Sequence, residues 1–194
     1  PPPPPSSPLP APPPVAPPGF PPGAVPPLSP PPPPSSDVWQ FIFTGVRDAS
    51  DNAVSLSQIY LYDANGGTVA ITAASNPLGV NPVLEGVENV FDGLLTTKWL
   101  DSNFSEASGS VVQLTLSATA TIVEYELVTG TGTAAANRRR DPTAWQFGHV
   151  SSSTGAFEVL SVVTGATPPD AASASYGRFW AVAPPPPPPF SPPP

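Results

Sequence analysis

The chain has 194 residues, of which 35 are proline and none is cysteine or methionine, and its formal net charge is −8 at pH 7. This acidic balance argues against nucleic acid and anionic membranes as partners, because both attract basic surfaces. The lack of cysteine excludes disulfides and thiolate zinc sites. No apolar run approaches the roughly 20 residues that are needed to span a bilayer.

The prolines divide the chain into three parts. Twenty-one of them lie in residues 1–36 and nine in residues 184–194, whereas residues 37–183 hold only five, together with every charged side chain. We therefore expect a proline-rich rod at 1–36, one folded domain at 37–183 and the start of a second rod at 184–194. Because the sequence has no initiator methionine and both ends fall within proline tracts, we expect it to be a segment of a longer protein.

The two flanks are expected to adopt polyproline II structure. Proline fixes φ and lacks an N–H, so a proline run favours this extended helix, which rises about 3.1 Å per residue. Such a tract serves either as a spacer or as a ligand for aromatic-lined grooves. The spacer is favoured, because short proline-rich ligands usually carry a flanking basic residue and these flanks have none.

Serine followed by a proline run occurs at residues 29–34 and 191–194. These sequences resemble hydroxyproline-rich extracellular glycoproteins of green-algal and plant walls. The resemblance implies hydroxylated prolines that carry short O-linked glycans, which would stiffen and solubilise a helix without internal hydrogen bonds. The alternative is an unmodified disordered linker. The residues expected to be modified are Ser29, Pro30, Pro31, Pro32, Pro33, Pro34, Pro184, Pro185, Pro186, Pro187, Pro188, Pro189, Ser191, Pro192, Pro193 and Pro194.

The middle segment is predicted to be all-β. Apolar and polar residues alternate in several short stretches, and turn sequences rich in Gly, Asn, Asp and Pro separate them. The size and the pattern suit one sandwich or jelly roll of seven or eight strands, with at most one helical turn, at residues 90–95. The predicted strands cover residues 39–44, 59–62, 112–116, 123–127, 145–147, 157–163 and 176–182.

Five motifs recur in a characteristic order in this segment: residues 39–48, residues 56–66, Asn89-Val90-Phe91-Asp92-Gly93, residues 96–101 and Arg140-Asp141-Pro142-Thr143-Ala144-Trp145. Together they resemble the discoidin, or coagulation-factor type C, group of galactose-binding-like domains. Their order and spacing carry the resemblance, which extends over residues 37–182. It implies an eight-stranded jelly-roll sandwich whose loops at one end often bind sugars or other surface ligands.

The resemblance also implies a structural calcium ion near the Asp-Gly loop. Asp92 would supply a carboxylate and Thr97 a hydroxyl, with loop carbonyls completing the oxygen shell that Ca²⁺ requires. Gln58 stands where the family usually has glutamate, so a carbonyl oxygen is kept but one charge is lost. The alternative is that Asp92 and Thr97 hydrogen-bond the backbone of the turn.

No catalytic constellation is predicted. His149 is the one histidine, on an alternating strand, and no nucleophile motif accompanies it.

Asn103 begins an N-glycosylation sequon. Arg138 and Arg139 belong to the one basic cluster and are candidates for contact with an acidic sugar or a neighbouring subunit, or are simply solvated, whereas Arg140 is expected to pair with an acid. The possible stacking platforms for a sugar ring are Trp99, Phe104, Tyr176 and Trp180.

Of these aromatic residues, Trp99 is expected in the core, and Phe104 is expected to be exposed because its loop is polar.

The favoured function is structural: an extracellular O-glycosylated unit of a cell wall, a surface coat or a hair-like filament on the flagellar surface, in contact with its own or neighbouring glycans and with like subunits. The resemblance includes the axial proteoglycans of algal surface filaments. The alternative is a carbohydrate-binding module tethered by proline-rich linkers to a larger secreted protein. We expect no enzymatic activity, no nucleic-acid binding and no membrane insertion of this segment.

Overall fold

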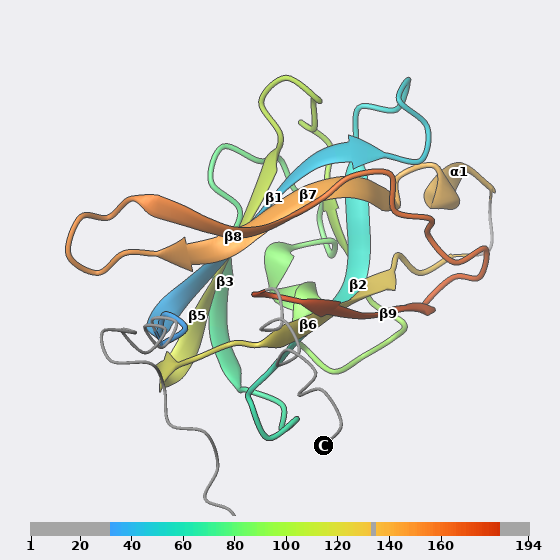
Figure 1. The fold of residues 1–194 in the computed structure, drawn as a ribbon. Helices are drawn as coiled ribbons and strands as arrows, with labels where there is room; N and C mark the ends of the chain where they lie inside the picture. Colours follow the sequence, from blue (N-terminus) through green and yellow to red (C-terminus); the bar gives the residue numbers. More distant parts are fainter. Residues whose placement is uncertain (1–31, 133–134, 183–194) are drawn as a thin grey trace, which may run out of the picture. The chain divides into compact units, whose positions relative to one another are not determined.

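The computed structural model describes residues 32–132 and 135–182, which form two antiparallel β-sheets (Figure 1). One sheet has the order β3-β5-β1-β7-β8 and the other β4-β2-β6-β9. The expected all-β class is thereby confirmed. The nine strands of these residues are β1 (Ser36–Val46), β2 (Val54–Tyr62), β3 (Ile71–Ser75), β4 (Trp99–Asp101), β5 (Ser110–Ala120), β6 (Glu124–Thr129), β7 (Pro142–Val150), β8 (Phe157–Val163) and β9 (Ser175–Trp180).

Helical structure within the described ranges is limited to two single turns, the 3₁₀ helix η1 (Val87–Val90) and α1 (Ala135–Arg138). The long stretch between β3 and β4 is mostly loop and carries η1. The proline runs at residues 1–31 and 183–194 lie outside the described residues, and so do the modification sites expected there. Residues 32–35 are described and belong to no strand.

Large aromatic side chains fill the space between the sheets. Trp39, Phe41 and Phe43 alternate along β1, and all three are fully buried, as their period of two predicts. Phe147 on β7 stacks on Trp39 with a centroid distance of 5.3 Å and lies 4.5 Å from Tyr125 of the opposite sheet. The core is therefore built around an aromatic cluster contributed by both sheets.

A glycine allows the edge strand β8 to approach β7. A Cβ atom on Gly148 would lie 2.0 Å from the carbonyl oxygen of Glu158, a backbone atom that no side-chain movement can relieve. The pairing of the two strands shifts at this point, between Phe147 and Gly148. A bulge of this kind bends the edge of a sheet, and here it depends on the absence of a side chain.

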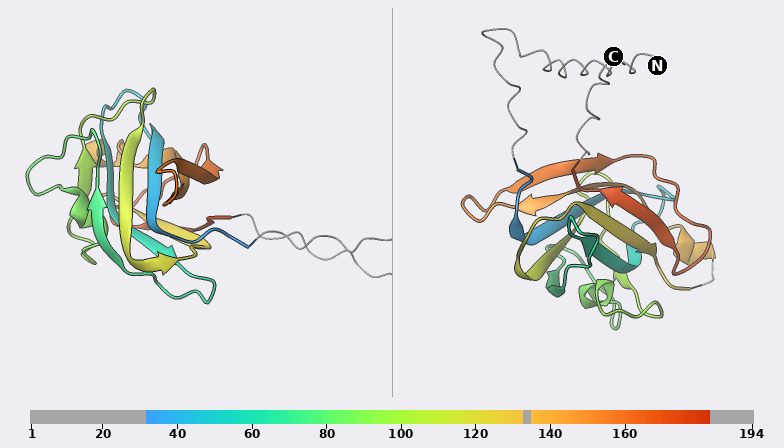
Figure 2. Two further views of the ribbon diagram at one scale, coloured as in Figure 1. Left: turned by 90° about the vertical axis from the view of Figure 1, so that its left-hand side faces the viewer. Right: turned by 60° about the horizontal axis from the view of Figure 1, so that its bottom comes forward.

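The two ends of the described domain lie together. Ser36 at the start of β1 pairs with Ala120, and the N–H of Ala181, just after β9, donates to the carbonyl of Val123 at 2.8 Å. Ala120 and Val123 are separated by two residues in the connection from β5 to β6. Figure 2 shows the beginning and the end of the coloured ribbon on the same side of the domain. The chain therefore enters and leaves this domain at neighbouring points.

Candidate functional site

The structure brings together the three residues for which a calcium site was predicted. Gln58, on β2, is 1% exposed, and its side chain reaches the loop that follows η1. Its Nε2 donates to Asp92 Oδ1 at 2.6 Å, and Thr97 Oγ1 donates to Asp92 Oδ2 at 2.6 Å. The register of β2 against β6 shifts between Leu56 and Gln58. An irregularity of this kind re-aims a side chain, and here it lies beside the one that reaches the loop.

Two backbone carbonyls complete the surroundings of this amide. Gln58 Nε2 also donates to the carbonyls of Asn89 at 2.9 Å and Leu94 at 3.2 Å, while the N–H of Gly93 donates to Gln58 Oε1 at 3.3 Å. A calcium ion needs six to eight oxygen ligands, but the point where three of these oxygens converge is taken by a nitrogen. In this arrangement the residues do not fit the ion, although calcium binding stays a prediction. Among the residues that the structure describes, no three His, Cys, Asp or Glu side chains gather as a metal site.

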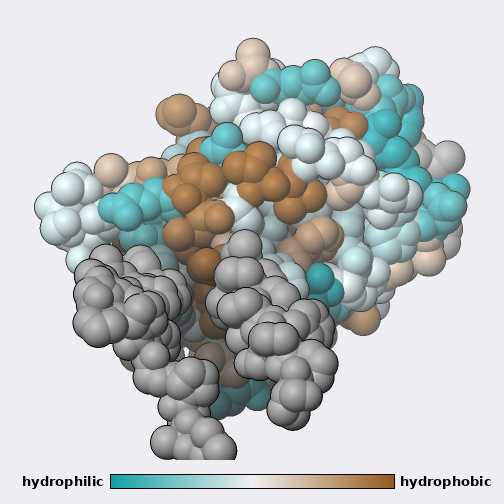
Figure 3. All heavy atoms as spheres, in the orientation of Figure 1, coloured by the Kyte–Doolittle hydropathy of each residue, from teal (hydrophilic) through white to brown (hydrophobic). Residues whose placement is uncertain are grey.

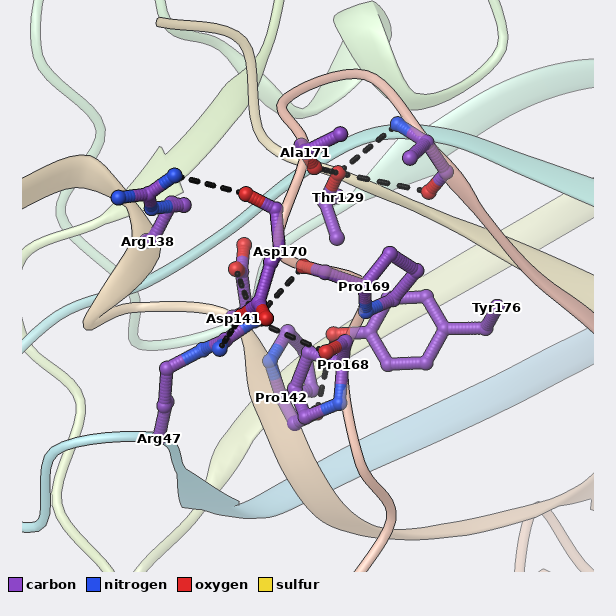
Figure 4. Close-up of polar contacts among 11 residues, drawn as sticks. Arg47, Thr129, Arg138, Asp141, Pro142, Pro168, Pro169, Asp170, Ala171 and Tyr176 are labelled. Atoms are coloured by element: carbon purple, nitrogen blue, oxygen red, sulfur yellow. Dashed lines mark hydrogen bonds and ion pairs between the residues drawn. The ribbon is translucent and has the colours of Figure 1, made fainter. Parts of the chain in front are cut away.

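A second polar cluster ties the end of β1 to two distant segments (Figure 4). Arg47 donates to the carbonyls of Pro168 at 3.0 Å and Pro169 at 2.7 Å and pairs with Asp170 at 2.8 Å. The same guanidinium lies 3.4 Å from the carboxylate of Asp141, which is 1% exposed and directly precedes β7. One arginine therefore joins β1, β7 and the loop from β8 to β9.

Burial raises the pKa of Asp141 to about 6 from an ordinary value of 3.8, and the neighbouring Arg47 only partly opposes this effect. Its Oδ1 is buried and has no hydrogen-bond partner within the part of the chain that the structure describes. Burial, followed by the charge of Asp141, also raises the pKa of Tyr176, whose hydroxyl donates to the carbonyl of Pro142 at 3.0 Å. The tyrosine therefore stays protonated throughout the range in which Asp141 titrates.

The raised pKa predicts an unusual pH dependence of stability. Because the folded state holds the Asp141 proton more tightly than the unfolded chain does, its contribution is fully present below about pH 4 and is lost as the pH rises to about 6. The difference in the free energy of unfolding is on the order of 2–3 kcal/mol. Urea unfolding of wild type and Asp141→Asn between pH 4 and 7 measures it. A free-energy difference between the two proteins that does not change over this range would contradict the prediction.

The three arginines of the basic cluster have partners within the domain. Arg138 donates to the carbonyl of Asp170 at 2.7 Å, and Arg139 lies 3.5 Å from Asp48. Arg140 pairs with Asp51 at 3.3 Å, as expected of an arginine that has an acidic partner inside the fold. Arg139 is about half exposed and is the most accessible of the three paired side chains for an external acidic group.

The aromatic candidates divide between core and surface. Phe104 is 4% exposed and belongs to the hydrophobic core, so the prediction that it forms an exposed platform is wrong. Trp99 is fully buried, as predicted, whereas Trp180 on β9 is 52% exposed. Val159 and Val162 on β8 are exposed as well, and Figure 3 shows hydrophobic residues gathered on one face of the domain. Trp180 is thus one of several exposed apolar side chains on edge strands.

Asn103 lies in the loop between β4 and β5 and is exposed. Its Nδ2 donates to the carbonyl of Leu78 at 3.0 Å, and its N–H donates to the buried carboxylate of Asp101. The sequon therefore lies on the surface, while its second residue, Phe104, anchors the loop in the core.

An open groove of about 530 Å³ lies among the loops before and after η1 and the segment after β6. Its polar lining includes Thr96, Thr97 and Asn137, and Leu84, which is 89% exposed, forms part of its apolar wall. None of the predicted ligand-binding residues Phe104, Arg138, Arg139 and Trp180 lines this groove. The predicted ligand-binding residues therefore lie outside this groove.

Arg47, Asn89 and the acceptor carbonyls around Gln58 were not among the predicted site residues. The position of Arg47 directly after a strongly apolar strand could have indicated its role. A charged side chain at the edge of a hydrophobic core needs ionic or hydrogen-bonding partners. Asn89 belongs to one of the motifs of the galactose-binding-like resemblance, but the group that contacts Gln58 is its backbone carbonyl and not its side chain. The amino-acid sequence does not reveal which carbonyls a loop turns inward.

No protein-family model, curated protein or solved structure matches this chain. Within the described ranges, no helix combines the length and the apolar composition that crossing a membrane requires.

Proposed function

We propose that this chain is a structural unit of an extracellular, O-glycosylated hydroxyproline-rich fibre or matrix, in which a galactose-binding-like jelly roll decorates or links proline-rich segments. The observation that carries this proposal is the closeness of the points where the chain enters and leaves the domain, Ser36 and Ala181, combined with a proline run in the sequence on each side. A domain attached in this way leaves the spacing along a fibre to the proline-rich segments.

The jelly roll is supported by the two antiparallel sheets and by the order of the galactose-binding-like motifs along the chain. The extracellular location is supported by the serine-plus-proline runs and by the exposed sequon at Asn103. The partners in such an assembly would be its own or neighbouring glycans and like subunits. A role in catalysis is not proposed.

Peptide-level mass spectrometry of the protein from its native source tests the proposal. We expect hydroxyproline carrying pentose or hexose in residues 1–34 and 184–194, and a hexose-rich glycan on Asn103. Pro77 and Pro82 serve as internal controls, because both are exposed but stand alone in the sequence, so they should remain unmodified. Unmodified proline runs would contradict the proposal and leave the flanks as plain linkers.

The second candidate is a tethered carbohydrate-binding module, and the groove near Thr96 and Asn137 favours it. The groove is lined by hydroxyl and amide groups and by the exposed side chain of Leu84, which are the kinds of groups that contact the polar and apolar faces of a sugar ring. The two functions are compatible, because the same groove would accept glycans carried by a neighbouring copy. Unmodified flanks in the mass spectra would make this second function the leading one.

A further inference from the structure

The side-chain amide of Gln58 occupies the centre of a small cage of oxygen atoms. Its Nε2 lies 2.6 Å from Asp92 Oδ1, 2.9 Å from the Asn89 carbonyl and 3.2 Å from the Leu94 carbonyl. The glutamine is 1% exposed, so water does not solvate this amide from the core side. Without a hydrogen-bond donor or a cation at this position, a carboxylate and two carbonyl dipoles would repel one another.

The chemistry of the cage fixes the orientation of the amide. If the amide were rotated by 180°, Gln58 Oε1 would face the Asp92 carboxylate at about 2.6 Å, and its NH₂ group would face the N–H of Gly93. Both contacts would then join like partners, acceptor to acceptor and donor to donor. Only a cation between the oxygens would make the rotated form favourable.

Both carboxylate oxygens of Asp92, an exposed residue, also accept hydrogen bonds from other protein donors. Thr97 Oγ1 donates to Oδ2 at 2.6 Å, and the N–H of Leu94 donates to Oδ1 at 2.8 Å. The carboxylate thus receives three protein donors, of which the Gln58 amide is the one that comes from the core sheet. Hydrogen bonds to a charged acceptor are the stronger kind.

We propose that the Gln58 amide takes the place of a cation in this loop, so that the domain holds the loop between η1 and β4 without calcium. A corollary is that Gln58→Glu converts the loop into a calcium-dependent one. Glutamate removes the donor and adds a second carboxylate beside Asp92, and two carboxylates with two carbonyls and the Thr97 hydroxyl are hard oxygen ligands of the kind that Ca²⁺ prefers. This proposal goes beyond the proposed function and holds whatever the role of the domain.

Thermal unfolding of the full 194-residue chain, in EDTA and in millimolar calcium chloride, tests the proposal. We expect the same midpoint for the wild type under both conditions. Gln58→Glu should unfold about 5–10 °C lower than the wild type in EDTA and recover at least half of that loss in calcium. Magnesium should restore less, because it requires a smaller, octahedral site. A wild-type midpoint that rises with calcium, or a glutamate variant that is indifferent to it, would overturn the proposal.

Two further variants show whether the calcium response comes from the oxygen cage around Gln58 or from any change of this kind elsewhere in the domain. Gln146→Glu makes the same change at a half-buried position on β7 and should show no response to calcium. Gln58→Leu supplies neither a donor nor a ligand, so its midpoint should be lowered equally in EDTA and in calcium. If the Gln58 variants fail to fold, calorimetric titration of calcium chloride into the wild type decides: no binding heat supports the proposal, and saturable binding overturns it.

Discussion

Replacing Phe147 by alanine is expected to lower the free energy of unfolding by about 3–5 kcal/mol, the cost of removing a buried aromatic ring and leaving a cavity. Phe147 is fully buried and lies at the centre of the aromatic cluster, with ring centroids of Trp39, Phe41 and Tyr125 within 5.3 Å. Because these rings come from both sheets, the cavity would open in the interface between the sheets. Urea unfolding followed by tryptophan fluorescence measures the change.

The size of the effect should depend on the volume removed. Phe147→Leu keeps most of the buried surface and should cost less than half as much as alanine. Val162→Ala, at a position 62% exposed on the neighbouring strand, should change the free energy of unfolding by less than about 0.5 kcal/mol. If alanine at position 147 were no more destabilising than at position 162, the aromatic cluster would not be the main support of the core.

Replacing Arg47 by methionine is expected to cost about 2–4 kcal/mol at pH 8. The substitution keeps an apolar stem but leaves the carboxylate of Asp141, 1% exposed, without its cation. It also leaves the carbonyls of Pro168 and Pro169 without their donor. This cost is smaller than that of breaking a fully buried ion pair, because the Arg47 side chain is 28% exposed.

Two comparisons identify the cause of this loss. Arg139→Met removes an arginine from an ion pair with Asp48 that is largely open to solvent, and it should leave the unfolding midpoint unchanged within error. Asp141→Asn in the Arg47→Met background should restore part of the stability, because no buried charge remains unpaired. A cost at Arg47 no larger than that at Arg139 would show that the cluster contributes little.

The strands that could be predicted from the sequence are those with one fully apolar face. Burial alternates over residues 41–44 of β1 and 124–127 of β6, so the buried residues of these stretches followed from the period of two. β3 and β4 were not predicted. The side chains of β3 are short and mostly exposed, and β4 is only three residues long, so neither carries a readable period. Strands β3 and β4 form because they pair with β5 and β2, which lie far away along the chain. A local sequence pattern does not encode such long-range pairing.

The predicted site shows the same division between local and distant information. The motifs correctly grouped Gln58, Asp92 and Thr97, whose spacing is fixed by one loop and one strand. They did not show which end of the Gln58 amide faces the carboxylate. Phe104 was misplaced because its sequence neighbours are polar, whereas its burial depends on core residues contributed by other parts of the chain.

The closeness of Ser36 and Ala181 also determines how the domain responds to tension. A force applied through the two flanks acts at neighbouring points, so it peels hydrogen bonds from one end instead of shearing whole strands against each other. Among the strands of residues 32–182, β9 has one partner, whereas β1 is paired on both sides, so β9 is expected to detach first. Complete unravelling would release on the order of 500 Å of chain. Under strong tension the domain would unfold and lengthen the chain, whereas under weak tension the folded domain would add almost nothing to the end-to-end length of the chain.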